Sequence, residues 1–100
     1  MESLVRILNQ SEPLGVTLEE LRSGSRQRRL VDARSLAAAL LMRQPFTRQQ
    51  DVAQLLEISQ PAVSQLLARH EGLLKGFPAY HRKWHEIIKN QNLKTQNNEK

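Results

Sequence analysis

Hydrophobic residues recur with a helical period over residues 25–44, a stretch that contains neither Gly nor Pro. Because these apolar positions lie three or four residues apart, they share one face of a helix. They are Leu30, Ala33, Ala37, Leu40 and Leu41. Pro45 follows directly and cannot continue a helical hydrogen-bond ladder, so we expect the main scaffold helix to end before it.

Two shorter patterns precede this scaffold helix. Apolar residues within residues 2–9 predict a brief helix. Further along, Thr17 and Glu20 stand three residues apart, which is the spacing of a capping box at a helix N-terminus. The Ser-Gly-Ser run at residues 23–25 is then expected to end that helix after about one turn. We therefore expect a loop in front of the scaffold helix.

Residues 47–70 predict two helices joined by a tight turn at residues 57–59. Thr47 with Gln50 is expected to cap the first helix, and Ser59 the second. Helices that cross over so short a turn need a small residue where they meet and apolar residues that fix the crossing angle. The chain supplies these as Ala53, Ile58, Val63 and Leu66. This pattern is typical of a helix-turn-helix.

The turn and the start of the second helix carry two further signals. Glu57 stands where such turns often have a Gly in the left-handed conformation, which costs a non-Gly residue about 1 kcal/mol. Pro61 is tolerated near the helix start, because the first-turn N–H groups have no helical acceptor. Short side chains at this end let a helix approach the major groove of DNA closely. The residues expected to contact base edges are Ser59, Gln60, Pro61, Ala62, Ser64 and Gln65.

Residues 78–92 predict a last helix, with Pro78 in its first turn. One face of this helix is apolar and carries Tyr80, Trp84, Ile87 and Ile88. This stripe either completes the core of the domain or pairs two chains as a homodimer, and the sequence leaves both open. Residues 93–100 have almost no apolar side chain, so we expect a disordered polar tail.

The composition fits one small helical domain. The chain has 100 residues, of which 39% are hydrophobic and 4% aromatic, enough for a helical core and too few aromatic residues for a β-sandwich. We therefore predict an all-α domain of about five to six helices over residues 1–92. There is no Cys, which excludes disulfides and thiolate metal sites. Without a signal peptide or a transmembrane stretch, we expect a cytoplasmic, nucleoid-associated protein.

Positive charge is concentrated in one part of the chain. The formal net charge is +5, and residues 21–48 contain seven arginines and no lysine. Guanidinium groups bind phosphate well and enter narrow minor grooves, although such a cluster is also consistent with a solvated helix face. Beside a helix-turn-helix, it favours duplex DNA as the partner. The residues expected to contact phosphate or the minor groove are Arg26, Arg28, Arg29, Arg34, Thr47, Arg48, Gln49 and Arg69.

Residues 17–71 resemble the C-terminal DNA-binding domain of the bacterial replication initiator DnaA, a module also appended to some transposases and related to Trp-repressor-like helix-turn-helix domains. The resemblance lies in the basic run at residues 25–34, the apolar helix after it and the turn between two helices. It implies a minor-groove role for Arg26 and a phosphate contact for Arg34. The family's Asp-His-Thr-Thr signature is replaced here by Ser-Gln-Pro-Ala at residues 59–62, so the resemblance implies no particular target sequence.

Together, these patterns predict sequence-selective binding of double-stranded DNA, in regulation of transcription, replication or a mobile element. The alternative is a helical protein-interaction or dimerisation module with non-specific DNA affinity, in which residues 47–70 are a plain helical hairpin. We expect no enzymatic activity, since no nucleotide loop, carboxylate pair or nucleophile constellation is present. His81 and His85 share a helix face but lack the pattern of a metal site, so we expect no metal, no other cofactor and no small-molecule substrate.

Overall fold

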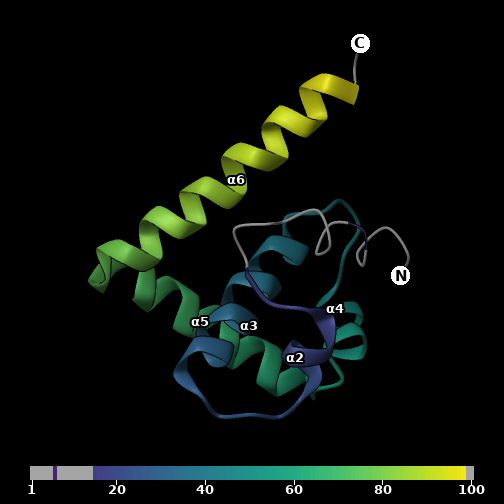
Figure 1. The fold of residues 1–100 in the computed structure, drawn as a ribbon. Coiled ribbons are helices and arrows are strands. Elements are labelled where there is room, and N and C mark those ends of the chain that lie inside the picture. Colours follow the sequence, from purple (N-terminus) through teal and green to yellow (C-terminus); the bar gives the residue numbers. More distant parts are fainter. Residues whose placement is uncertain (1–5, 7–14, 99–100) are drawn as a thin grey trace.

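The computed structural model describes Arg6 and residues 15–98, with side chains described up to residue 90. Five helices form the described part, and it contains no strand (Figure 1): α2 Leu18–Arg22, α3 Arg28–Met42, α4 Gln49–Leu56, α5 Gln60–Gly76 and α6 Pro78–Asn98. The predicted all-α architecture is therefore confirmed. The predicted helix at residues 2–9 lies outside the described residues, apart from Arg6.

Helix α3 is the centre of the core and contacts α2, α4 and α5. Every residue from Ala33 to Leu41 is buried, so the middle of this helix is enclosed on all sides. Ala37 and Ala38 are small and fully buried, which lets the surrounding helices approach α3 closely. The helix ends at Met42, ahead of Pro45 as predicted.

The capping box predicted for α2 is confirmed. The Glu20 N–H donates to Thr17 Oγ1 at 3.1 Å, and the Thr17 N–H donates to Glu20 Oε1 at 3.1 Å. The pKa of Glu20 is held below its ordinary value, first by this Thr17 N–H and then by Arg29. Gly24 follows the helix with a φ of +75°, so the loop at residues 23–27 begins in a conformation that favours glycine.

The last two helices differ in length from the prediction. Helix α5 continues through Gly72 to Gly76 instead of ending near His70. Helix α6 runs to Asn98, beyond its predicted end at residue 92 and into the stretch expected to be a disordered tail. Residues 91–98 contain no Gly or Pro, so no helix-breaking residue stops α6 there. The end of α6 extends away from the other helices (Figure 1).

The apolar stripe of α6 lies in the core of a single chain. Tyr80 and Ile87 are buried, and Trp84 and Ile88 are half-buried against the same cluster. This corresponds to the first of the two alternatives predicted for the stripe. Burying these side chains needs no second copy of the chain.

Candidate nucleic-acid interface

We call α4, the turn at residues 57–59 and the first part of α5, up to His70, the α4–α5 hairpin. Its turn begins at Glu57, which adopts the left-handed conformation with φ 58° and ψ 45°, as the sequence predicted. The Ile58 N–H donates to the Ala53 carbonyl at 2.9 Å and closes the end of α4. Ser59 caps α5, because its Oγ accepts a hydrogen bond from the Ala62 N–H at 3.2 Å.

The predicted cap of α4 is wrong by one residue. Arg48 is the N-cap, and its N–H donates to Asp51 Oδ2 at 2.9 Å. Thr47 and Gln50 therefore do not form the cap. The carboxylate of Asp51 is a stronger acceptor than the amide of Gln50, and its negative charge is favourable at a helix N-terminus.

Apolar side chains fix the position of α5 in the hairpin. Ala53 and Val63 are buried, while Ile58 and Leu66 are half-buried against the core cluster. These are the four residues that the sequence analysis selected for this purpose. The opposite face of α5 is consequently held outward on a rigid helix.

The residues expected to contact bases lie at the start of α5. Ala62 is half-buried and lines the cavity described below. The other five are exposed: Ser59, Gln60, Pro61, Ser64 and Gln65. Ser64 Oγ donates to Gln49 Oε1 at 2.8 Å, so the first residue of α4 and the second turn of α5 share one surface. The half-buried Thr47 and the exposed Arg48 directly precede Gln49.

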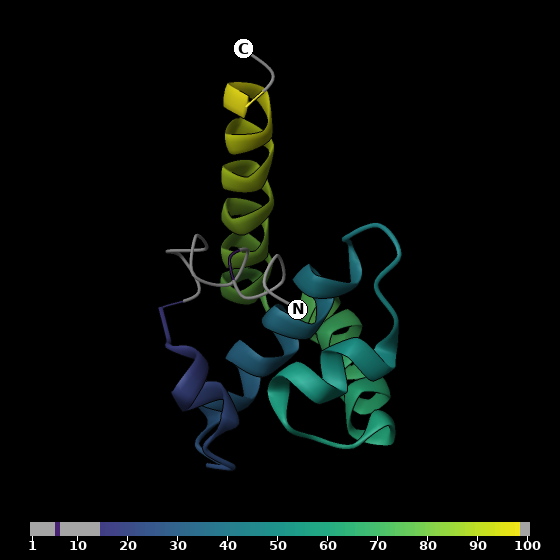
Figure 2. The same cartoon turned by 90° about the vertical axis from the view of Figure 1, so that its right-hand side faces the viewer.

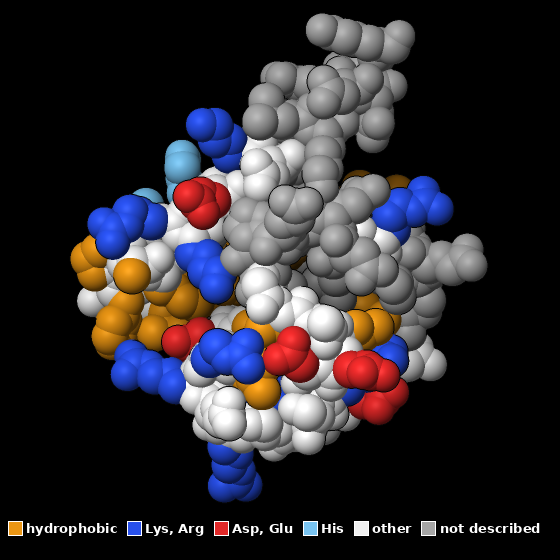
Figure 3. Space-filling model, in the orientation of Figure 1, with side chains coloured by type: hydrophobic (Ala, Val, Ile, Leu, Met, Phe, Trp, Pro, Cys, Tyr) orange, Lys and Arg blue, Asp and Glu red, His pale blue; other side chains and the backbone are white. Residues whose placement is uncertain are grey.

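Acidic residues pair with several of the candidate arginines. Arg29 Nη2 lies 3.2 Å from Glu20 Oε2, and Arg69 Nη2 lies 2.9 Å from Asp32 Oδ1. Arg28 contacts the same Asp32 at 3.8 Å. Basic and acidic side chains are accordingly interspersed on the face seen in Figure 3.

Arg26 and Arg48 form a separate class. Both are exposed, and neither forms an ion pair with any side chain that the structure describes. They therefore carry the least neutralised positive charge among the candidate phosphate contacts.

Arg34, which was expected to contact phosphate, does not lie on the surface. Its side chain is buried, with 8% exposed. Nε donates to the Leu21 carbonyl at 2.7 Å, and Nη1 donates to the Ser25 carbonyl at 2.6 Å. Nη2 is buried and has no hydrogen-bond partner among the described residues. Arg34 thus holds the end of α2 and the 23–27 loop against α3, and the expectation of an exposed phosphate contact at this position is corrected.

Arg22 is a contact that the sequence analysis missed. Its Nε donates to the Leu55 carbonyl at 2.8 Å and lies 3.4 Å from Glu57 Oε2. It therefore ties α2 to the turn of the hairpin. The spacing of 33 residues between Arg22 and Leu55 gives no local sequence signal for this hydrogen bond.

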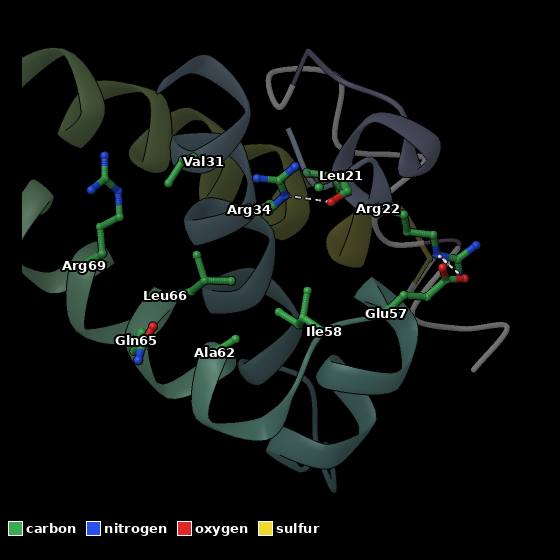
Figure 4. Close-up of a pocket in the computed structure, with 11 residues that line it drawn as sticks. Leu21, Arg22, Val31, Arg34, Glu57, Ile58, Ala62, Gln65, Leu66 and Arg69 are labelled. Atoms are coloured by element: carbon green, nitrogen blue, oxygen red, sulfur yellow. Dashed lines mark hydrogen bonds and ion pairs between the residues drawn. The ribbon is translucent and has the colours of Figure 1, made fainter. Parts of the chain in front are cut away.

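A cavity of about 450 Å³ lies between α2, α3 and α5 (Figure 4). Its walls are partly apolar, with Leu21, Val31 and Leu66, and Gln65 adds an amide. Figure 4 shows Arg69 and Arg22 on opposite sides of the cavity with Arg34 between them. The flank of α5 is therefore concave and bordered by guanidinium groups.

The side chain of His70 is buried between α5 and α6. We call this contact the α5–α6 joint. The His70 Nδ1 lies 2.7 Å from the Tyr80 hydroxyl, and the His70 ring centroid lies 4.5 Å from that of Trp84. Burial lowers the pKa of His70 and raises the pKa of Tyr80 above its ordinary value. Both groups are therefore held in their neutral forms at pH 7.

The described residues contain no group of three or more side chains suited to hold a metal ion, and His81 and His85 are both exposed. None of the helices over residues 15–98 is sufficiently long and apolar to cross a membrane. No protein-family model, curated protein or solved structure matches this chain.

Proposed function

We propose that this chain binds double-stranded DNA sequence-selectively, with the α4–α5 hairpin acting as a helix-turn-helix. The observation that carries the proposal is the arrangement at the start of α5. Five polar or small side chains there are exposed, on a helix whose other face is anchored by Val63 and Leu66. A rigid helix with exposed short side chains at its N-terminus fits the major groove.

In this proposal the first turns of α5 enter the major groove. Gln60 and Gln65 carry amides that can pair with the N6 and N7 positions of adenine, and Pro61 and Ala62 offer apolar contacts to a thymine methyl group. The Ser64 hydroxyl donates its proton to Gln49, so it is less available to read a base. We therefore assign this pair to contacts with the DNA backbone, which orient the helix.

Positive charges flank the helix in two loops. Arg26 lies in the loop at residues 23–27, and Arg48 lies at the end of the loop between α3 and α4. Figure 2 shows these loops at opposite ends of the domain. We assign both arginines to the DNA backbone or an adjacent minor groove, the role that the DnaA-like resemblance implies for Arg26. Because Arg28, Arg29 and Arg69 have acidic partners, we assign them weaker contributions.

Two substitutions separate contacts to bases from contacts to phosphate. We expect Gln60→Ala to relax the preference at one base pair by about 1–3 kcal/mol. We expect Arg26→Ala to weaken binding to all duplexes and to reduce the slope of log affinity against log salt by about 1. Arg82→Ala is the matched control, because it removes the same charge from an exposed position on α6. Equal effects of all three variants on specific and random duplexes would contradict the assignment.

The internal ion pairs favour a second candidate function. If Asp32 and Glu20 neutralise most of the basic surface, the domain is a helical protein-interaction module with only non-specific affinity for DNA. Such a module binds specific and scrambled duplexes with equal affinity and releases both duplexes at moderate salt concentration. A fluorescence anisotropy titration with both duplexes therefore distinguishes the two functions.

A further inference from the structure

Phe46 has a fully exposed side chain, with a relative accessibility of 100%. It lies in the loop between α3 and α4 and has a φ of 63°. The Thr47 N–H donates to the Gln44 carbonyl at 3.3 Å, so residues 44–47 form a hydrogen-bonded turn. With Pro45 second and a positive φ third, this turn has the pattern of a type II turn, whose third position favours Gly or Asn. A large aromatic residue therefore occupies a strained position and contributes nothing to the core.

The surroundings of Phe46 are positively charged. Arg43 and Arg48 are exposed on either side of it along the chain, and neither forms an ion pair within the described part of the molecule. The nearest acid along the chain, Asp51, accepts the Arg48 N–H at the start of α4. An apolar side chain between two guanidinium groups that have no acidic partner among the described residues is complementary to a polyanion with apolar edges.

The position of Phe46 relative to α5 points to one such partner. Gln49, three residues further on, is hydrogen bonded to Ser64 on the exposed face of α5. In a helix-turn-helix complex the first helix crosses the DNA backbone beside the major groove. Phe46 precedes the N-cap Arg48 by two residues, a reach of about 7 Å in extended chain. In such a complex, a side chain at this distance from the N-cap can reach past the sugar–phosphate strand to the minor groove on its other side.

We propose that Phe46 enters the minor groove next to the major-groove site of α5 and packs against sugars and base edges, while Arg43 and Arg48 bind the bordering phosphates. This inference rests on the function proposed above and adds a second groove contact to it. Apolar side chains placed in a minor groove partly unstack a base step and bend the duplex. Flexible pyrimidine–purine steps are consequently favoured at the flank.

The test uses the full chain and the duplex that is enriched from a random pool, with 2-aminopurine at the flanking step. Phe46→Asn removes the ring and keeps the turn, since Asn tolerates the left-handed conformation. Phe46→Leu keeps an apolar side chain and is the matched control. We expect Phe46→Asn to bind the duplex about tenfold more weakly and to lose most of the change in 2-aminopurine fluorescence that the wild-type chain produces. We expect Phe46→Leu to retain most of the affinity and most of the fluorescence change. Circular dichroism and thermal melting verify that both variants are folded.

The outcomes separate this inference from the proposed function. If the wild-type chain binds selectively but Phe46→Asn binds equally well with the same 2-aminopurine signal, the minor-groove contact is wrong and the helix-turn-helix proposal stands. If the wild-type chain shows no preference for the enriched duplex over a scrambled one, the proposed function fails, and this inference fails with it. Equal losses in Phe46→Asn and Phe46→Leu also overturn the inference, because they show that an apolar side chain at position 46 does not restore the contact.

Discussion

Replacing Arg34 by Met tests whether this side chain stabilises the fold by holding neighbouring segments together. The guanidinium joins three segments, because it extends from α3 and donates to the Leu21 carbonyl at 2.7 Å and to the Ser25 carbonyl at 2.6 Å. Met has a similar length and no donor, so Arg34→Met keeps most of the packing and removes both hydrogen bonds. The two carbonyl groups then lose their partners.

The size of the effect follows from these contacts. A hydrogen bond from a charged donor contributes about 1.5–3 kcal/mol, so the loss of two amounts to roughly 3–6 kcal/mol. Removing a buried charge, whose Nη2 has no partner among the described residues, offsets part of this loss. We expect a net decrease of about 2–3 kcal/mol in the free energy of unfolding, which corresponds to a Tm lower by roughly 10–20 °C for a domain of this size.

Urea denaturation followed by circular dichroism at 222 nm measures this change. Arg26→Met is the matched control, because Arg26 is exposed and forms no ion pair with a described residue. We expect this control to stay within about 0.5 kcal/mol of the wild-type chain. If Arg34→Met is as stable as Arg26→Met, the structural role of Arg34 is refuted.

Three further predictions concern the hairpin turn and the α5–α6 joint. Lowering the pH from 7.5 to 5.5 should decrease the free energy of unfolding. His70 binds a proton at a pKa of about 6.5 in the unfolded state, while burial keeps its pKa lower in the folded state. A decrease of equal size in the His70→Gln variant contradicts this role of His70. Tyr80→Phe leaves His70 Nδ1 without its partner and should cost about 1–3 kcal/mol in urea denaturation, whereas a neutral effect excludes a stabilising hydrogen bond. Glu57→Gly should stabilise the chain by about 0.5 kcal/mol, since relief of the left-handed backbone outweighs the loss of the exposed Arg22 ion pair. Glu57→Ala is its control and should give no gain; a Gly variant less stable than the Ala variant contradicts the strain.

The hairpin was predictable because its determinants are local. Ser59 caps the helix that it precedes, and the left-handed Glu57 follows from the shortness of the turn. The predicted capping pair of α4 was Thr47 with Gln50, whereas the structure has Arg48 with Asp51, so the helix starts one residue later than predicted. The pattern of apolar residues does not determine that shift, because helix ends are set by individual hydrogen bonds.

The burial of Arg34 was not predicted, because its hydrogen-bond partners are distant in the sequence. Its acceptors belong to residues 13 and 9 positions earlier, and periodicity alone places an arginine beside an apolar stripe on the surface. One signal does point to burial. The run from Ser35 to Leu41 contains no charged residue, which is typical of a helix enclosed on all sides, and Arg34 lies at the edge of this run.

Selection from a randomised duplex pool, followed by anisotropy titration of the enriched and a scrambled duplex at several salt concentrations, tests the proposed function most directly. The proposal predicts one enriched motif, bound roughly 10³-fold or more tightly than the scrambled control at physiological salt. Equal affinity for the two duplexes at every salt concentration, or no binding at low salt, would contradict it.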